Sequence, residues 1–353
     1  EMAIKCEPEN LVNYYYLGEL KKDILTPALK EKIKKIMSKK NNTNINLSYS
    51  NYLLSKYEKK EKNYGKEIKY LIDGHKNFFI SKKEKFKLGI KYCFEDILQI
   101  QKFSTVKKTK NKIDKDMKPI FIIGVPRCGS TLVEKIITSG KEKIPMGEET
   151  AVLENFINKK ILENQSLDLG EDKLLRDELF NIYKNKGLIS EKYNYVFTDK
   201  SLNNFFYINL IKSVFPSSKI IHCKRDYLSS IMSIFQNNLT ELSWTHSLEN
   251  IFKYFDNYIK LTENLNSQQP DLVYNLNFED LVNNPKHTSK KIMEFCNLPW
   301  DISCLEFYKR KDLFSKTASN IQIRKPIFKN SSEKYLVYKK YLSEHGKKYS
   351  WFN

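Results

Sequence analysis

The stretch PIFIIGVPRCGSTLVEKII, residues 119–137, determines the predicted fold. An apolar run typical of a buried strand ends at Gly124, and apolar residues at helical spacing follow from Ser130. The turn between them is bounded by glycines, a geometry in which backbone N–H groups and a helix N-terminus bind phosphate. The stretch therefore predicts a strand, a phosphate-binding loop and a helix in direct succession.

The same stretch nearly matches the nucleotide P-loop pattern G-x-x-x-x-G-K-[ST], with Gly124, Gly129 and Thr131 in register. Ser130 stands where that pattern has lysine, and the cation of the loop is Arg127 instead. Because nothing then reaches a γ-phosphate, a nucleotide-dependent kinase or NTPase becomes the alternative rather than the main hypothesis. A tight turn without a ligand is the structural alternative.

Three further β-rich runs follow, at 195–200, 218–226 and 272–280. Helical segments are predicted between the runs, at about 130–140, 150–163, 202–214, 227–237, 247–266 and 286–296. Short apolar strands that alternate with helices indicate an α/β fold, here a P-loop-like parallel sheet flanked by helices. Ligands of such sheets bind at the carboxyl ends of the strands.

Residues 1–112 show helical spacing without strand-like alternation, which predicts an all-α N-terminal extension before a second domain at 113–353. Residues 47–79 resemble one tetratricopeptide unit with a turn near Lys62–Tyr64. A single unit cannot bury its own face, so it must pack on a neighbour, and such an extension could bind a protein partner. A plain helical extension is the alternative. The basic stretch 106–118 is predicted to be a linker.

The formal net charge of +19 suggests nucleic acid as a partner, but its distribution disfavours that hypothesis. Most of the excess lies in the predicted extension, where lysine runs are typical of solvated surface. Only five of the 61 basic residues are arginine, at 127, 176, 225, 310 and 324. In so lysine-rich a chain, each arginine indicates a need for a planar, bidentate donor.

Six scattered cysteines form no C-x-x-C pair, and five histidines form no metal-binding pattern, so no metal site is predicted. Unpaired cysteines in a chain of this length favour reduced thiols and a cytoplasmic location. The first residues lack the basic start and apolar run of a signal peptide. No membrane span is expected, since no run approaches the roughly 20 apolar residues required.

The segment VPRCGSTLVEK (125–135) resembles the 5'-phosphosulfate loop of sulfotransferases, especially tyrosylprotein sulfotransferases and bacterial enzymes with tetratricopeptide extensions. Four further motifs follow in the order of that family, within residues 119–342. The resemblance implies transfer of a sulfuryl group from 3'-phosphoadenosine 5'-phosphosulfate (PAPS) to a hydroxyl of a peptide or small molecule, with adenosine 3',5'-bisphosphate as product. It also implies that loop residues bind the donor, namely Arg127, Cys128, Gly129, Ser130, Thr131 and Leu132.

Two of the motifs imply catalytic residues in addition to Arg127. PMGEETAVLENF (145–156) resembles the family segment whose second glutamate is the general base, which implies that role for Glu149. VFTDKSLNNFFYINLI (196–211) resembles the segment whose lysine contacts the phosphosulfate, which implies Lys200. A cation there neutralises charge that develops on the leaving oxygen. His246 is the alternative base.

The remaining motifs imply contacts to the adenosine part of the donor. SKIIHCKRDYLSSIMSIF (218–235) implies that Arg225 and Ser233 hold the 3'-phosphate, with Ser229 and Ser230 as alternatives to the serine. The segment 318–342 resembles the part that folds over the nucleotide, and the residues it implies are Ser331 and Lys334, followed by Arg324.

Two positions depart from the family pattern. Cys128 replaces a serine of many relatives, and a thiol at a helix N-terminus is predicted to have a lowered pKa and to be open to alkylation that blocks donor binding. Phe278 stands where a tyrosine hydroxyl is expected. A non-catalytic helical-repeat interaction protein is a further alternative, which the set of Arg127, Glu149, Lys200 and Arg225 argues against.

Overall fold

The computed structural model describes residues 1–107, 116–263, 265–310, 312, 325–327 and 332–352. The chain forms two compact units, each assembled from separate segments. The first contains Glu1–Phe94, Tyr227–Asp256 and Ser332–Asn353, and the second contains Glu95–Asp226 and Asn257–Ser331. The predicted domain division between residues 112 and 113 stays a prediction.

The second unit contains a parallel sheet with the strand order β4-β2-β5-β6. Its strands are β2 (Lys118–Gly124), β4 (Val196–Asp199), β5 (Lys219–Lys224) and β6 (Val273–Asn277). Residues 120–123 of β2 are at most 1% exposed, as expected of a central parallel strand covered on both faces. The predicted α/β fold and its four strands are confirmed, although the last strand ends at Asn277 and residues 278–283 are helical.

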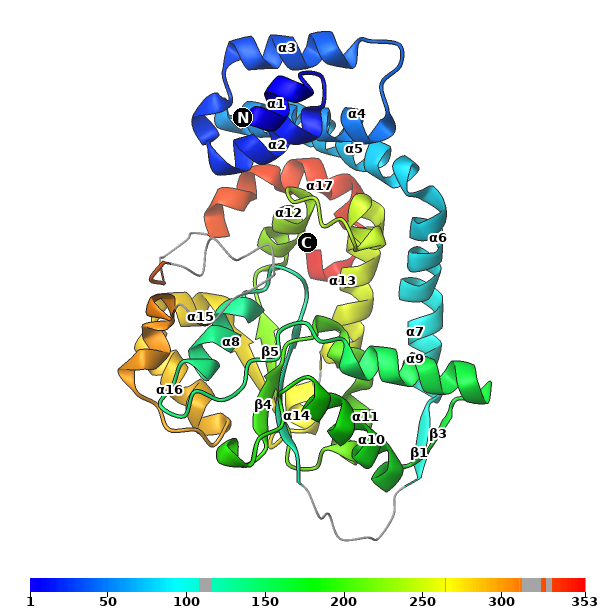
Figure 1. The fold of residues 1–353 in the computed structure, drawn as a ribbon, viewed down its shortest axis with the longest axis vertical. Helices are drawn as coiled ribbons and strands as arrows, with labels where there is room; N and C mark the ends of the chain where they lie inside the picture. The colour runs from blue at the N-terminus through cyan, green and yellow to red at the C-terminus, as the bar shows by residue number, and fades with distance from the viewer. Residues whose placement is uncertain (108–115, 264, 311, 313–324, 328–331, 353) are drawn as a thin grey trace. The chain divides into compact units, whose positions relative to one another are not determined.

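Helices cover both faces of this sheet. Figure 1 shows α8, α15 and α16 on one side and α9, α10 and α11 on the other. Their bounds are α8 (Ser130–Thr138), α9 (Val152–Asn164), α10 (Asp172–Asn185), α11 (Ile208–Val214), α15 (Phe278–Asn283) and α16 (Pro285–Phe295). Helix α10 was not predicted from the sequence, and a 3-10 helix, η4 (Leu202–Tyr207), forms the first half of the helix predicted at 202–214. The remaining helical segments of this unit are η2 (Tyr92–Asp96), a π-helix that starts in the first unit, α7 (Ile97–Phe103), η3 (Glu191–Tyr193), α14 (Leu265–Gln268), η6 (Ile302–Leu305) and η7 (Phe307–Lys309).

A small second sheet corrects one expectation. Strand β1 (Thr105–Lys107) pairs in parallel with β3 (Asp168–Glu171), where the sequence predicted the start of a linker. The amide of Thr105 donates to the carbonyl of Leu167 (3.1 Å), so the strand is held by a partner about 60 residues away that local sequence patterns do not reveal. The middle of the predicted linker, residues 108–115, lies outside the described residues.

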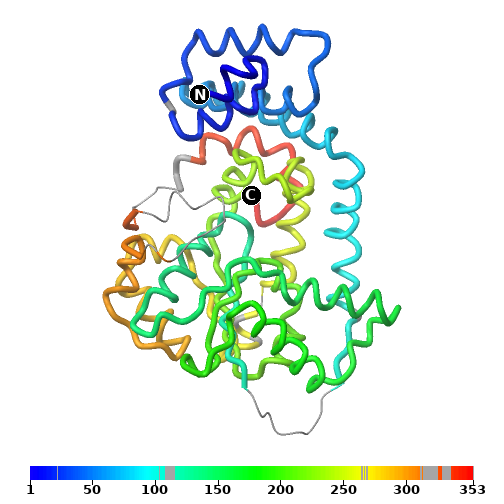
Figure 2. The backbone as a smooth tube through the Cα atoms, viewed as in Figure 1, coloured from blue at the N-terminus to red at the C-terminus, as the bar shows by residue number. Residues whose placement is uncertain are grey.

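The first unit is helical, as predicted for its N-terminal part, and its first helices lie together at the top of Figure 2, while the helix at 83–91 leads away from them. The helices of this part are α1 (Met2–Cys6), α2 (Leu11–Leu20), η1 (Lys22–Ile24), α3 (Pro27–Met37), α4 (Asn44–Lys60), α5 (Tyr64–Ser81) and α6 (Lys83–Lys91). Side chains of Asn10, Thr26 and Thr43 cap α2, α3 and α4. The turn predicted near Lys62–Tyr64 separates α4 from α5, whereas their likeness to a tetratricopeptide unit stays a prediction.

Two later segments complete this unit with α12 (Tyr227–Phe235), η5 (Ser243–His246), the first part of α13 (Leu248–Thr262), η9 (Ser332–Tyr338), α17 (Lys339–Gly346) and η10 (Ser350–Phe352). A buried carboxylate joins all three segments. Glu67 accepts hydrogen bonds from the hydroxyl of Tyr338 (2.7 Å) and the amide of Gln236 (2.8 Å). These contacts connect residues that lie up to 271 positions apart in the sequence.

His246, the alternative base, is a core residue of the first unit. Its ring stacks on Phe78 and Phe86, and its Nδ1 lies 3.0 Å from Nδ1 of His75. Burial lowers the pKa of His246 to about 2. A neutral imidazole that is 4% exposed and enclosed by aromatic rings is not placed to meet an acceptor.

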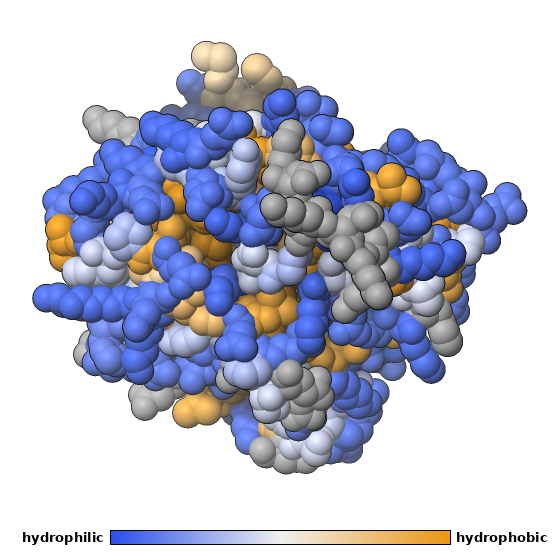
Figure 3. Space-filling model, turned by 90° about the horizontal axis from the view of Figure 1, so that it is seen from below, coloured by the Kyte–Doolittle hydropathy of each residue, from blue (hydrophilic) through white to orange (hydrophobic). Residues whose placement is uncertain are grey.

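The surface fits the lysine-rich composition. Seen from below, hydrophilic side chains surround smaller apolar patches (Figure 3). Within the described ranges, no helix combines the length and apolar character needed to cross a membrane.

Candidate functional site

The loop between β2 and α8 has a backbone that requires glycine at two positions. Gly124 has φ +151°, and a Cβ there would lie 2.7 Å from the carbonyl oxygen of Cys223. Gly129 has φ +96°, precedes the first turn of α8, and lies so close to the ring of Phe278 that a Cβ would overlap it. Arg127 also has a positive φ, 71°. The loop is therefore wound tightly against the carboxyl end of the sheet, as expected of a phosphate-binding turn.

Arg225 follows the end of β5 and lies against this loop. Its Nη1 donates to the carbonyl oxygen of Arg127 (2.9 Å), and its guanidinium lies over the ring of Phe278 at 4.9 Å. Its Nε is buried and finds no hydrogen-bond partner in the described part of the chain. A buried donor of this kind is normally satisfied, and an anion between Arg225 and the loop would satisfy it.

Lys200 follows the end of β4, and the structure brings it together with Glu149. The Lys200 ammonium is fully buried and donates to Oε1 of Glu149 at 2.8 Å. The Glu149 side chain is 54% exposed, so one side faces the buried cation and the other is open to solvent. A carboxylate in that position can meet a proton donor from outside while remaining oriented by the lysine.

Backbone hydrogen bonds place Glu149 beside Lys200. The carbonyl of Glu148 accepts from the amide of Lys200 (2.8 Å), and the carbonyl of Pro145 accepts from the amide of Thr198 (3.1 Å). Gly147 approaches the Thr198 carbonyl so closely that any Cβ would overlap it. Residues 145–148 therefore extend along the edge strand β4 and deliver Glu149 to its carboxyl end.

Asp199, which was not among the predicted site residues, organises both sides of this pair. Its Oδ2 accepts from the hydroxyls of Thr150 and Tyr183, both at 2.8 Å, and its Oδ1 accepts from the amide of Ser201 (2.9 Å). Asp199 thus holds the residue after Glu149 and the residue after Lys200. An acidic residue at the end of an apolar strand, next to Lys200, was the available signal.

The predicted lowering of the Cys128 pKa is confirmed, but its main cause is a second thiol. A hydrogen bond with Cys223 lowers it most; burial opposes the shift, while hydrogen bonds with Ser130 and the charge of Lys200 favour it. The same hydrogen bond raises the pKa of Cys223. Cys128 is 1% exposed, which argues against the predicted access of alkylating reagents.

The other predicted donor-binding residues lie in different parts of the fold. Ser130 and Thr131 are buried in the first turn of α8, and Leu132 follows them half-buried. Ser233 lies on α12 in the first unit. Lys334 lies in η9 with its side chain outside the described residues, and Ser331 and Arg324 lie outside them entirely. The roles of all these residues stay predictions.

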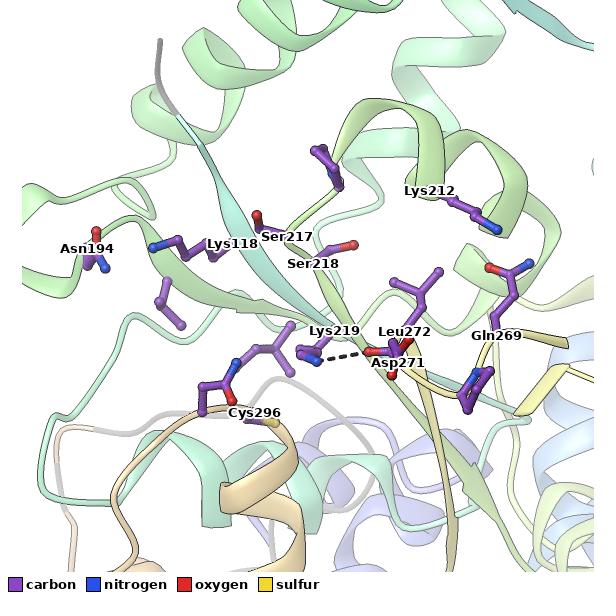
Figure 4. Close-up of a pocket in the computed structure, with 15 residues that line it drawn as sticks. Lys118, Asn194, Lys212, Ser217, Ser218, Lys219, Gln269, Asp271, Leu272 and Cys296 are labelled. Atoms are coloured by element: carbon purple, nitrogen blue, oxygen red, sulfur yellow. Dashed lines mark hydrogen bonds between the residues drawn. The ribbon is translucent and has the colours of Figure 1, made fainter. Parts of the chain in front are cut away.

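A cavity of about 640 Å³ lies at the opposite, amino edge of the sheet, where Lys118, Lys212 and Lys219 line it (Figure 4). The ammonium of Lys219 donates there to the carbonyl of Asp271 (2.9 Å). Lysine makes up about a sixth of the whole chain, so three lysines among 15 lining residues are close to the number expected by chance and do not indicate an anion site. The candidate site is therefore at the carboxyl edge.

Comparison with known proteins identifies sulfotransferases as relatives of this chain. The sequence model described as the sulfotransferase family matches residues 119–302, which include the loop, Glu149, Lys200 and Arg225. An uncharacterized protein of Aquifex aeolicus is 28% identical over 312 residues, which are 83% of this chain and 40% of that protein. Protein-tyrosine sulfotransferase 1 of Danio rerio is 26% identical over 213 residues, 54% of this chain and 56% of that protein. The chain spans about half the length of these curated relatives.

Among solved structures, the sulfotransferase domain of the Synechococcus PCC 7002 olefin synthase is similar to this chain at 17% identity and a TM-score of 0.42. The similarity covers 64% of this chain and 88% of that domain.

Proposed function

The chain belongs to the sulfotransferase family, and we propose that it transfers a sulfuryl group from PAPS to an acceptor hydroxyl. The observation that carries this proposal is the contact between Glu149 and the buried Lys200 at 2.8 Å, at the carboxyl edge of the sheet that also carries the tight loop. A base, a buried cation and an anion-binding turn are the groups that sulfuryl transfer requires.

The residues present fit the donor. The N-terminus of α8 offers amides to a phosphate, and the lysine that a nucleoside triphosphate would need is replaced by Ser130. The buried Nε of Arg225, without a partner among the described residues, supports a second anion close to the loop. The 3'-phosphate of PAPS is such an anion, and we assign it to Arg225 together with Ser233. Ser331 and Lys334 are proposed to complete the nucleotide contacts.

In the proposed reaction, Glu149 accepts the proton of the acceptor hydroxyl through its exposed side. The acceptor oxygen bonds to sulfur while the bond from sulfur to the phosphate oxygen breaks, which leaves adenosine 3',5'-bisphosphate. The Lys200 ammonium has three N–H donors, so it can orient Glu149 and also stabilise the charge on the departing oxygen. Arg127 and the loop amides would share that charge.

We propose a hydroxyl of a peptide or a small molecule as the acceptor. The similarity to a protein-tyrosine sulfotransferase extends over 54% of this chain, which makes a tyrosine-containing peptide the first acceptor to test. We also propose that the N-terminal helices bind a protein partner.

Calorimetric titration with adenosine 3',5'-bisphosphate, with ATP and 5'-AMP as controls, tests the donor class. We expect binding of the bisphosphate alone and its loss in Arg225→Ala. Lys212→Ala is the matched control, because it also removes one cation but at the opposite edge of the sheet. Preferential binding of ATP would favour the kinase or NTPase alternative, and binding of no nucleotide would favour an interaction protein.

A further inference from the structure

Glu134 is a buried acid one turn into α8, and the proposed reaction does not use it. It is 1% exposed, and its Oε1 accepts from the hydroxyl of Thr198 (2.8 Å) and from the amide of Glu148 (2.9 Å). Burial raises the pKa of Glu134, while the charge of Lys200 and these two hydrogen bonds oppose that shift. Burying a carboxylate costs free energy. The presence of Glu134 in the interior beside the proposed catalytic residues therefore requires an explanation.

Its partner Glu148 has a backbone conformation that needs support. Glu148 has φ 55°, in the left-handed region, which costs a residue with a side chain about 1–2 kcal/mol. Both of its backbone polar groups are held: its N–H by Glu134, and its carbonyl by the amide of Lys200 (2.8 Å). Glu149 follows directly, so the direction of the proposed base depends on this turn.

The same carboxylate also holds the edge strand. Thr198 donates to Glu134 and at the same time accepts from the amide of Gly147 (3.1 Å). Glu134 thus accepts hydrogen bonds from Glu148, which directly precedes Glu149, and from Thr198 on β4, which lies two residues before Lys200. It also lies on the helix that begins at the donor loop.

We propose that Glu134 is a positioning residue that fixes Glu149 and Lys200 relative to the donor loop. This inference rests on the proposed function. One rigid helix then sets both the place of the transferred group, through its N-terminus, and the direction of the base, through Glu134. This arrangement orients Glu149, which lies on a strained turn with a half-exposed side chain and would otherwise be held less firmly.

A structural role alone would have different consequences. If Glu134 only stabilised the fold, its removal would lower the melting temperature and weaken donor binding and turnover together. If it positions the base, turnover falls while donor binding is kept, because the loop amides and Arg225 do not depend on the 145–149 segment. The split between kcat and the Kd for adenosine 3',5'-bisphosphate separates the two roles.

The test compares Glu134→Ala and Glu134→Gln in the full chain. We expect kcat to fall roughly 100-fold in Glu134→Ala, the size typical of a misplaced reacting group, with an unchanged Kd for the bisphosphate. Glu134→Gln should recover most of the kcat, because its amide oxygen can still accept from Glu148 and Thr198. Glu163→Ala, which removes an exposed carboxylate on α9, is the control and should behave like the wild type.

A wild-type kcat in Glu134→Ala, or a Glu134→Gln as slow as Glu134→Ala, would overturn the inference. Should Glu134→Ala not fold, Thr198→Val removes one of the two donors to Glu134 at nearly constant volume. An unchanged kcat in Thr198→Val would also overturn the inference. Glu149→Gln separates this result from the proposed function. If Glu149→Gln is fully active, the proposed base is wrong; if it is inactive while Glu134→Ala is normal, only the positioning role is wrong.

Discussion

The fully buried ammonium of Lys200 donates to the half-exposed carboxylate of Glu149 at 2.8 Å. The two residues come from segments about 50 positions apart and are aligned by backbone hydrogen bonds between residues 145–148 and β4. Because only Lys200 is buried, replacing Lys200 and replacing Glu149 should have different consequences. Replacing the exposed acid affects chemistry, whereas replacing the buried cation also affects the interior.

Glu149→Gln should lower kcat by about 10²–10⁴-fold, the range typical for loss of a general base. The amide can still accept from Lys200, so the local structure and the Kd for adenosine 3',5'-bisphosphate should be retained. Steady-state kinetics with labelled donor and calorimetry measure both quantities. The same exchange at the exposed Glu163 is the control, and a kcat near that of the control would assign the base elsewhere.

Lys200→Met should lower both stability and activity. Methionine fills a similar volume and Glu149 can be solvated when its partner is lost, but the buried Glu134 loses the favourable charge of Lys200, so we expect a decrease in melting temperature. The kcat should fall by about 10²–10³-fold, because the departing oxygen loses its stabilising cation. A large loss of stability with preserved turnover would show that Lys200 is structural.

Gly147→Ala should loosen the segment that carries Glu149. The new Cβ would overlap the carbonyl of Thr198, so either the segment or β4 must move, at a cost of about 1–3 kcal/mol. Urea unfolding measures the stability, and kcat should fall with it. Gly18→Ala is the matched control, because a Cβ on that helix would lie 3.5 Å from its nearest neighbour, so it should be neutral or stabilising by up to about 1 kcal/mol.

Acid should destabilise the first unit through its paired histidines. Burial lowers the pKa of His75 to about 4 and that of His246 to about 2, against 6.5 for an ordinary histidine. Below pH 6.5 the unfolded chain therefore binds protons that the folded chain does not. Each histidine then costs up to about 1.4 kcal/mol of stability per pH unit until its folded pKa is reached.

Urea unfolding at pH 7 and pH 5 measures this slope. His246→Phe should make it shallower, because a phenyl ring can occupy the stack between Phe78 and Phe86 without titrating. An unchanged slope would exclude His246 as a source of the acid sensitivity.

Cys128 should react with iodoacetamide far more slowly than Cys6 in the folded chain. Cys128 is 1% exposed and Cys6 is exposed, so access and not the lowered pKa of Cys128 controls the rate. Mass spectrometry of peptides after timed labelling compares the two cysteines within one sample. Equal labelling would mean that the loop opens readily, and loss of bisphosphate binding should then accompany modification.

The sequence predicts the parts of the site that depend on neighbouring residues in the chain. The apolar run before Gly124 and the helix after Ser130 fix the loop, and strand ends at 199 and 224 place Lys200 and Arg225 at the same edge. Glu134 could not be identified in this way, since its two partners lie 14 and 64 positions further along the chain. The pairing of β1 with β3 likewise depends on a partner distant in the sequence.

The bonds that Glu67 makes with Gln236 and Tyr338 bear on the order in which the chain can fold. During synthesis the N-terminal helices leave the ribosome long before Tyr338, 271 positions further on, so Glu67 cannot be satisfied when its own helix forms. Closure over such a span is slow. Until it occurs, Glu67 lacks a native hydrogen-bond donor, so its burial is favourable only after residues 332–352 have been made.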